Sequence, residues 1–193
     1  MDEFGKQLIF LKLGGSLITD KNQPMTARLD ILNRIFMEIA EYRENHPSTK
    51  FIIGHGSGSF GHVAGKKYGT RDGVTDPSGW IGFFEVYTAA RKLNQIVYSS
   101  GLEAQIPLMP FPLCTTTTTR HRQIQNWDLR PLQKALQQDF IPLVYGDVSF
   151  DEELGGTILS TEEIFSHLTA ELHPDRILLA GIEPGIWQDY PNN

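Results

Sequence analysis

Short apolar runs alternate with segments of helical periodicity along most of this chain, and this alternation most restricts its fold. LIFLKL (8–13) and FIIG (51–54) are typical of buried strands, and between them apolar residues recur at helical spacing over 28–42. Alternating strands and helices build a parallel sheet with helices on both faces. We therefore expect an α/β fold, a three-layer αβα sandwich with a mostly parallel central sheet.

The same pattern continues along the rest of the chain. We predict further helices over 80–100, 129–138 and 161–172, and further strands over 105–111, 141–148 and 176–181. The threonine run 115–119 is the only low-complexity segment, and we place it in a loop or hairpin as a solvated connection. Since 193 residues can bury one sizeable core, we treat residues 1–193 as a single domain.

Charge and cysteine content exclude several classes of protein. The 17 basic and 23 acidic residues give a net charge of -6, which argues against a broad nucleic-acid surface because such surfaces need clustered Lys and Arg. Cys114 is the only cysteine, which rules out an internal disulfide and a Cys-rich zinc site. The first residues lack the features of a signal peptide, and no apolar stretch is long enough to span a membrane. We expect a cytoplasmic protein with no nucleic-acid or membrane partner.

Two of the predicted strands end in glycine-rich turns. Gly14-Gly15-Ser16 follows the first strand, and GHGSGSFGH (54–62) follows the second. Glycine has no Cβ atom, so backbone N–H groups can approach an anion closely, and a following helix adds a positive dipole. Neither turn is a GxxxxGK[ST] motif, and neither matches the dinucleotide fingerprint followed by an acidic ribose partner. Because open α/β sheets bind ligands at the carboxyl ends of their strands, we expect both turns there, on neighbouring strands.

Three charged or titratable side chains near these turns indicate a phosphate ligand. Lys12 lies in a predicted buried strand, where an ammonium group is costly unless it meets an anionic partner. Lys21 is close enough in sequence to supply a second cation, or else it is a solvated loop lysine. His62 closes the second glycine turn and is either a phosphate donor or a structural histidine.

These motifs resemble a known family. LKLGGSLITDK and GHGSGSFGH, followed by PLVYGDV, GGTILSTEEI and RILLAG, are similar to the isopentenyl phosphate kinases of the amino-acid-kinase superfamily. The resemblance spans nearly the whole chain, and the combination of KxGGSxIT-K with GSFGH is its most specific part. It implies the amino-acid-kinase fold and the ATP-dependent phosphorylation of isopentenyl phosphate to isopentenyl diphosphate, a reaction of isoprenoid biosynthesis. It also implies ATP and Mg²⁺ as cofactors and a homodimer.

For the nucleotide side, the resemblance implies roles for individual residues. The implied ATP-binding residues are Lys12, Gly14, Gly15, Ser16, Gly58 and Gly181. Lys12 and the first turn would hold the β- and γ-phosphates, and Lys21 would stabilise the transferring phosphoryl group. Glu162 would orient the lysines in place of the family's aspartate, although its side chain is one methylene longer. No protein residue is implied as a metal ligand.

For the acceptor side, the resemblance implies that His62, with backbone donors near Ser57, grips the monophosphate. The catalytic set is therefore Lys12, Lys21, His62 and Glu162. No general base is needed, because the attacking oxygen already belongs to an ionised phosphate. The apolar tail of the acceptor would lie against the helix predicted over 80–100, where Phe83, Phe84 and Tyr87 are candidates for its wall or are ordinary core residues.

The chain departs from the family at several positions. Ser57 replaces a glycine of the second turn, and LLAGIEPGIW (178–187) replaces a Thr-Asp-Val-Asp-Gly-like turn, so Ala180 and Gly181 remove two polar groups. Family members continue with a further segment, containing a Gly-rich turn and a lysine, that completes the nucleotide site. We therefore expect an acceptor-binding lobe plus an incomplete nucleotide lobe, with the C-terminal part of the fold missing, either because the polypeptide is truncated or because it is a divergent member of the family.

Other functions stay open. The chain could phosphorylate another small phosphate or phosphonate, as fosfomycin-kinase relatives do, because His62 favours a phosphorylated acceptor without identifying its tail. A non-catalytic phosphate-binding relative is the second alternative, which the retention of Lys12, Lys21 and His62 disfavours. A Rossmann oxidoreductase is the least favoured, because the dinucleotide fingerprint followed by its acidic partner is lacking.

Overall fold

A five-stranded parallel sheet forms the centre of the computed structural model, which describes residues 7–183 apart from the side chains of 62–64. The strand order is β3-β6-β2-β1-β9, and every neighbouring pair is parallel. The strands are β1 (Gln7–Leu13), β2 (Thr49–His55), β3 (Leu108–Pro110), β6 (Ile141–Tyr145) and β9 (Arg176–Ala180). The expected parallel central sheet is therefore confirmed.

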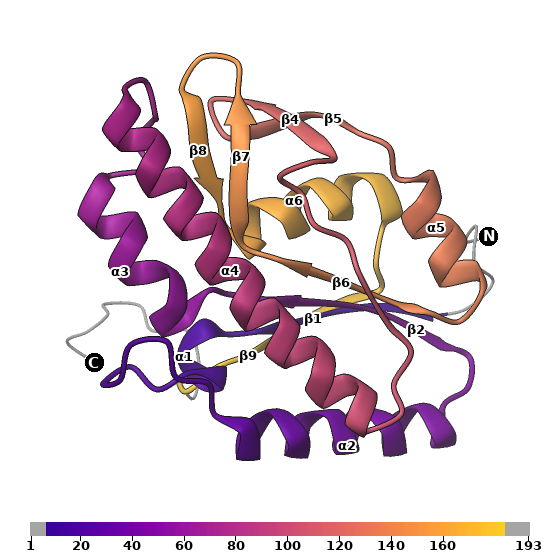
Figure 1. Cartoon of the computed structure of the whole chain (residues 1–193). Helices are drawn as coiled ribbons and strands as arrows, with labels where there is room; N and C mark the ends of the chain where they lie inside the picture. Colours follow the sequence, from indigo (N-terminus) through magenta and orange to yellow (C-terminus); the bar gives the residue numbers. More distant parts are fainter. Residues whose placement is uncertain (1–6, 184–193) are drawn as a thin grey trace.

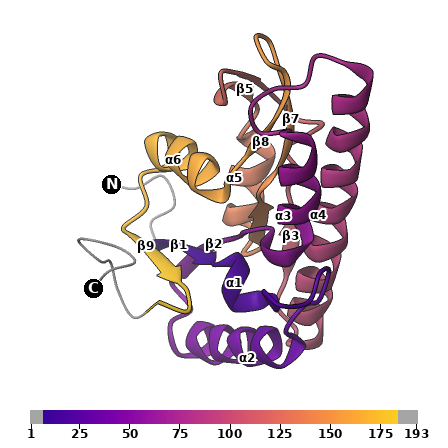
Figure 2. The ribbon, with the colours of Figure 1, turned by 90° about the vertical axis from the view of Figure 1, so that its left-hand side faces the viewer.

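Helices cover both faces of this sheet. One face carries α2 (Leu29–Asn45) and α4 (Pro77–Glu103), and the other carries α5 (Arg130–Gln137) and α6 (Thr161–Leu172). Figure 1 shows α2 below the sheet and α5 and α6 above it, and the turned view in Figure 2 shows the same layers for α2 and α6. The three-layer αβα sandwich is confirmed.

Two further helices follow the glycine turns. The single turn α1 (Gly15–Ile18) comes after β1, and α3 (Gly58–Tyr68) comes after β2. None of the helices in the described part of the chain is long and apolar enough to cross a bilayer.

A second sheet of four strands stands beside the central one. Its order is β5-β4-β7-β8, with β4 (Thr117–Arg120), β5 (Gln123–Trp127), β7 (Asp147–Asp151) and β8 (Gly155–Leu159). The pairs β4–β5 and β7–β8 are antiparallel hairpins that rise above the central sheet in Figure 1. One expectation is wrong here, because 141–148 is not one strand. The chain leaves the central sheet at Gly146, and the apolar residues on both sides of the Gly146-Asp147 pair read as one run.

The threonine run forms part of the β4–β5 hairpin, as one of the two expected placements. Its interpretation as a solvated connection is wrong for Thr117 and Thr119, which are buried. The Thr119 hydroxyl donates a hydrogen bond to Asp151 Oδ2 over 2.9 Å. Asp151 also accepts bonds from the backbone N–H groups of His121 and Arg122 at the hairpin turn. A buried carboxylate therefore holds the two hairpins together.

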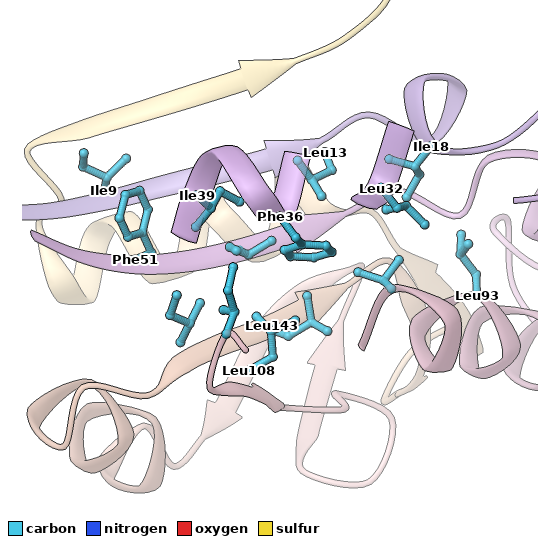
Figure 3. Close-up of a cluster of buried hydrophobic side chains, with 14 of the residues drawn as sticks. Ile9, Leu13, Ile18, Leu32, Phe36, Ile39, Phe51, Leu93, Leu108 and Leu143 are labelled. Carbon is cyan, nitrogen blue, oxygen red and sulfur yellow. The ribbon is translucent and has the colours of Figure 1, made fainter. Parts of the chain in front are cut away.

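Strand alternation divides the residues of β1 between two apolar cores. Ile9 and Leu13 face α2 and α4, where they pack among the side chains shown in Figure 3, including Phe36 and Leu93. Leu8 and Phe10 face the opposite way, toward α5 and α6. Lys12 has the same parity as this second set, so β1 directs it toward α6.

Candidate active site

The two glycine turns lie side by side at the carboxyl edge of the central sheet. Leu13 pairs with His55 at the ends of β1 and β2, and the Gly56 N–H donates to the Leu13 carbonyl over 3.1 Å. On the other side of β1, the Gly14 N–H donates to the Ala180 carbonyl over 2.8 Å. The expected placement of both turns on neighbouring strands is correct.

The turns touch each other through backbone atoms, which explains two of their glycines. A Cβ atom at Gly15 would lie 2.4 Å from the Gly58 nitrogen, closer than any real contact. Gly58 has a φ of +47°, and a Cβ atom there would lie 2.1 Å from Thr19 Oγ1. That hydroxyl accepts from the Ser59 N–H over 2.9 Å and donates to the Gly15 carbonyl over 2.7 Å. Thr19 therefore ties the first turn to the second.

Four backbone amides at this junction are available to a ligand. The N–H groups of Gly15, Ser16, Ser57 and Gly58 have no hydrogen-bond acceptor among the described residues. Consecutive N–H groups in turns form concave sites for anions, and α3 adds the positive end of its dipole. The junction can therefore hold phosphate oxygens. It brings together predicted donors of both turns, except Gly14, whose N–H is already bonded to the Ala180 carbonyl.

Lys12 and Glu162 form an ion pair beside the junction. The Lys12 side chain is only 17% exposed and that of Glu162 is 63% exposed. Partial burial would raise the pKa of Glu162, but the hydrogen bond and charge of Lys12 lower it below its ordinary value. A capping box between Ser160 and Glu163 fixes the first turn of α6 and so the position of Glu162. This contact is the one expected of an acid that orients a lysine.

Sequence reasoning missed the partners of Glu163. Arg71 Nη2 lies 3.1 Å from Glu163 Oε1, and Arg71 Nη1 donates to the Ile158 carbonyl over 3.2 Å. Arg122 Nε lies 3.5 Å from the same carboxylate. These residues come from a loop, a hairpin and a helix that are distant in sequence, so no local spacing could have indicated them. They brace the start of α6, where Glu162 lies.

For two of the predicted catalytic residues, Lys21 and His62, the described part of the structure gives no contact that supports a role in the site. Lys21 lies in an exposed turn after the β-bridge between Thr19 and Ala27, and it forms no ion pair among the described residues. His62 lies in α3, but its side chain is outside the described part. Gly181 lies just after β9 and next to Gly14, so it does join the edge of the site.

Of the three residues predicted to line the apolar tail of the acceptor, two point into the protein and one points outward. Phe83 is buried with Val86 and Val148, and Tyr87 packs against this cluster. Phe84 points outward and is 67% exposed. Helical geometry accounts for this difference, because consecutive residues of a helix do not share a face. The structure therefore retains Phe83 and Tyr87, but not Phe84, as candidates to line an apolar tail.

Asp147 is a second residue to which sequence reasoning gave no role. It is only 1% exposed; its Oδ1 accepts from the Val148 N–H over 2.8 Å, and its Oδ2 has no hydrogen-bond partner in the described part of the chain. Burial raises the pKa of Asp147 to about 7, against the opposing effects of backbone hydrogen bonds and the Arg91 charge. The only sequence signal for Asp147 was its position in the Gly-Asp pair that follows an apolar run. Among the side chains that the structure describes, no three of His, Cys, Asp or Glu are grouped to hold a metal ion.

Comparison with known proteins gives a consistent result. The model of the amino acid kinase family matches residues 7–193. The isopentenyl phosphate kinase of Methanocaldococcus jannaschii is 31% identical over 191 residues, which cover 94% of this chain and 72% of the relative. That of Methanothermobacter thermautotrophicus is 29% identical, with 95% and 70% covered. A solved isopentenyl phosphate kinase superimposes with a TM-score of 0.88 at 28% identity, covering 96% of this chain and 77% of that one.

Proposed function

The chain belongs to the amino acid kinase family, and because relatives that it matches at 31% and 29% identity are isopentenyl phosphate kinases, we propose that it transfers a phosphoryl group from ATP to isopentenyl phosphate. One observation carries the proposal. Two glycine turns meet backbone to backbone beside the Lys12–Glu162 pair, and they present four amides that have no acceptor among the described residues. This arrangement suits two phosphate groups that must be held next to each other.

The proposed reaction needs no covalent intermediate with the protein. An oxygen of the acceptor phosphate attacks the γ-phosphorus of ATP, and the bond to the ADP oxygen breaks. Backbone amides and the Lys12 ammonium stabilise the negative charge on the phosphoryl oxygens as it shifts during transfer. Glu162 holds Lys12 in place, and its carboxylate is thereby occupied. Mg²⁺ remains a prediction, and it would supply further charge neutralisation between the phosphates when bound with ATP.

The remaining roles complete the proposal. Lys21 stabilises the transferring phosphoryl group, and His62 with Ser57 binds the acceptor phosphate. Phe83 and Tyr87 contact its apolar tail, in keeping with their place in a buried apolar cluster. The homodimer, the cytoplasmic location and the division into an acceptor-binding lobe and an incomplete nucleotide lobe stay predictions.

A coupled ADP-release assay with Mg-ATP and isopentenyl phosphate tests this function. We expect turnover, and in His62→Ala we expect an acceptor KM raised at least about tenfold, because a charged hydrogen bond to phosphate is lost. His46→Ala is the matched control, since His46 lies at the opposite end of β2. An unchanged acceptor KM in His62→Ala would contradict the acceptor role.

Two results would favour the alternatives. Turnover with a small phosphonate but not with isopentenyl phosphate would indicate a kinase with another acceptor. Binding of isopentenyl phosphate without ADP release, under conditions where ATP also binds, would indicate a non-catalytic phosphate-binding relative.

A further inference from the structure

His55 is a buried histidine that the proposed reaction does not use. It ends β2 immediately before the second glycine turn and is 1% exposed. Its ring stacks on Tyr145 with centroids 5.4 Å apart and an interplanar angle of 9°. The ring nitrogens lie 3.1 Å from the Gly56 carbonyl oxygen (Nδ1) and 3.2 Å from Asn94 Oδ1 (Nε2). Every polar atom of this side chain is therefore engaged.

The two ring contacts assign the position of the proton. Burial lowers the pKa of His55 below its ordinary value, although the bonds to Gly56 and Asn94 oppose this shift, so the ring is neutral with one N–H. A carbonyl oxygen can only accept, so the nitrogen that faces Gly56 must be the donor. Nε2 is then an acceptor, which requires the Asn94 amide to be flipped so that its NH₂ group, rather than Oδ1, faces the ring. The opposite tautomer would set a ring lone pair against the carbonyl.

This hydrogen bond determines which way the neighbouring peptide faces. In a trans peptide the C=O and N–H groups point in opposite directions, so a Gly56 carbonyl held toward the His55 ring turns the Ser57 N–H away from it. The Ser57 amide is one of the four that lack an acceptor among the described residues. A peptide that follows glycine rotates easily, because glycine imposes little steric restriction. Rotation would present a carbonyl oxygen to a bound phosphate in place of a donor.

The backbone of His55 links the same point to the rest of the site. Its carbonyl oxygen accepts from Thr161 Oγ1 over 2.7 Å and from the Gly146 N–H over 3.1 Å. Thr161 is the first residue of α6 and precedes Glu162. Asn94 belongs to α4, which carries the candidate tail wall. One residue therefore joins the glycine turn, the helix that holds Lys12 through Glu162, and the acceptor side.

We propose that His55 is a positioning residue that fixes the Gly56–Ser57 peptide with its N–H toward the bound phosphate. The inference deepens the proposed kinase function and rests on it for the identity of the phosphate. Its physical content, an Nδ1–H donor that orients an anion-binding amide, can be measured without turnover.

Three variants separate orientation from packing. His55→Phe keeps a ring against Tyr145 and removes the donor, whereas His55→Asn keeps an amide donor at the position of Nδ1. His167→Phe is the matched control, because His167 also stacks on an aromatic ring, that of Trp127, away from the turns. We expect kcat/KM for the acceptor to fall at least about tenfold in His55→Phe, to stay within about threefold in His55→Asn, and to stay near that of the unaltered chain in His167→Phe. Equal activity of His55→Phe and the unaltered chain would overturn the proposal.

NMR measurements on the unaltered chain keep the test independent of both folding of the variants and turnover. The ¹⁵N shifts of the His55 ring should show a protonated Nδ1, and the Ser57 amide should shift when inorganic pyrophosphate is added. An Nε2–H tautomer, or a Ser57 amide that does not respond while pyrophosphate binds at the neighbouring amides, would refute the role of His55. If both signatures are present and isopentenyl phosphate is not phosphorylated, the proposed function fails and the positioning role stands.

Discussion

Lys12 lies on the face of β1 that also carries Leu8 and Phe10, so the strand directs an ammonium group toward an apolar core. Its burial is tolerated because the first turn of α6 brings the Glu162 carboxylate to it. The ion pair joins residues 150 positions apart. The sequence could therefore predict that Lys12 has an anionic partner, but only the resemblance could suggest which residue it is.

Replacing the Glu162 carboxylate should affect catalysis more than stability. The Glu162 side chain is largely exposed, so the pair contributes only about 0–1 kcal/mol to the free energy of unfolding. In Glu162→Gln, however, Lys12 loses the charge that orients it, and we expect kcat to fall roughly ten- to hundredfold. The measurements are steady-state kinetics and thermal unfolding, with Glu171→Gln on the exposed surface of α6 as the control. A large loss of stability with unchanged kcat would show that the pair is structural.

For His62 and Lys21, the predicted roles rest on the family resemblance and are not tested by the structure. The motif GSFGH assigns a role to His62 only through the resemblance, and the described part of the structure does not include its side chain. His55 shows the reverse. It stands in the same glycine-rich segment, but a histidine at the end of a strand has no distinctive sequence signal, and its role follows from burial and hydrogen bonds.

The elements were predicted well where their periodicity was strong. The helix expected over 161–172 is α6 (Thr161–Leu172), and the strands at 8–13 and 51–54 are the inner parts of β1 and β2. Prediction failed where two structures share one pattern. An apolar run that crosses from one sheet to another looks like a single strand, and a threonine run on a half-buried hairpin looks like a solvated loop.

The junction between the two turns makes a prediction about α1 and α3 as a unit. In Gly15→Ala the new Cβ would meet the Gly58 backbone, so the turns must separate, and we expect a loss of about 2 to 3 kcal/mol of stability together with loss of activity. Gly146→Ala is the steric control at the same edge of the sheet, because a Cβ there meets its nearest atom at 3.4 Å. Chemical denaturation of both variants is the measurement. Equal stabilities of the two variants would contradict the close approach of the turns.

For the whole molecule, the alternation of strands and helices predicted the layers, and the family comparison confirmed the resemblance that carried the function. Because β1 and β2 are parallel neighbours, the glycine turns that follow them must both lie at the carboxyl edge of the central sheet. Contacts such as Arg71 with Glu163 could not be anticipated, because they depend on how distant elements pack rather than on any local sequence pattern.

The titration of Asp147 should make the free energy of unfolding depend on pH. Its pKa is raised to about 7 in the folded protein, so between about pH 4 and pH 7 the folded state binds more protons than the unfolded state. Stability therefore falls as the pH rises through this range, by an amount on the order of 4 kcal/mol from this one group, and then levels off. Asp147→Asn should remove that loss, so its advantage over the unaltered chain should grow from pH 4 to pH 7.

Asp151 provides the control with the opposite sign. Although burial opposes it, hydrogen bonds from four backbone N–H groups and from Thr119 hold the pKa of Asp151 well below its ordinary value. The stability that it contributes is present above the unfolded pKa and is lost as the pH falls. Asp151→Asn should therefore cost most near neutral pH. Urea unfolding from about pH 2 to pH 8 measures both variants, because the Asp151 contribution is lost mainly below the unfolded pKa of about 4. Parallel pH profiles of Asp147→Asn and the unaltered chain would contradict the first prediction.

The direct contact between the two glycine turns also bears on the entropy of the reaction. Since Thr19 and the backbone of both turns fix their spacing, the separation of the two phosphate groups that they would hold is determined before either ligand arrives. The junction between the two turns is then ordered once, when the chain folds, and this ordering is not repeated at each catalytic cycle. Two mutually repelling anions would meet at high effective molarity in a site that does not have to assemble around them.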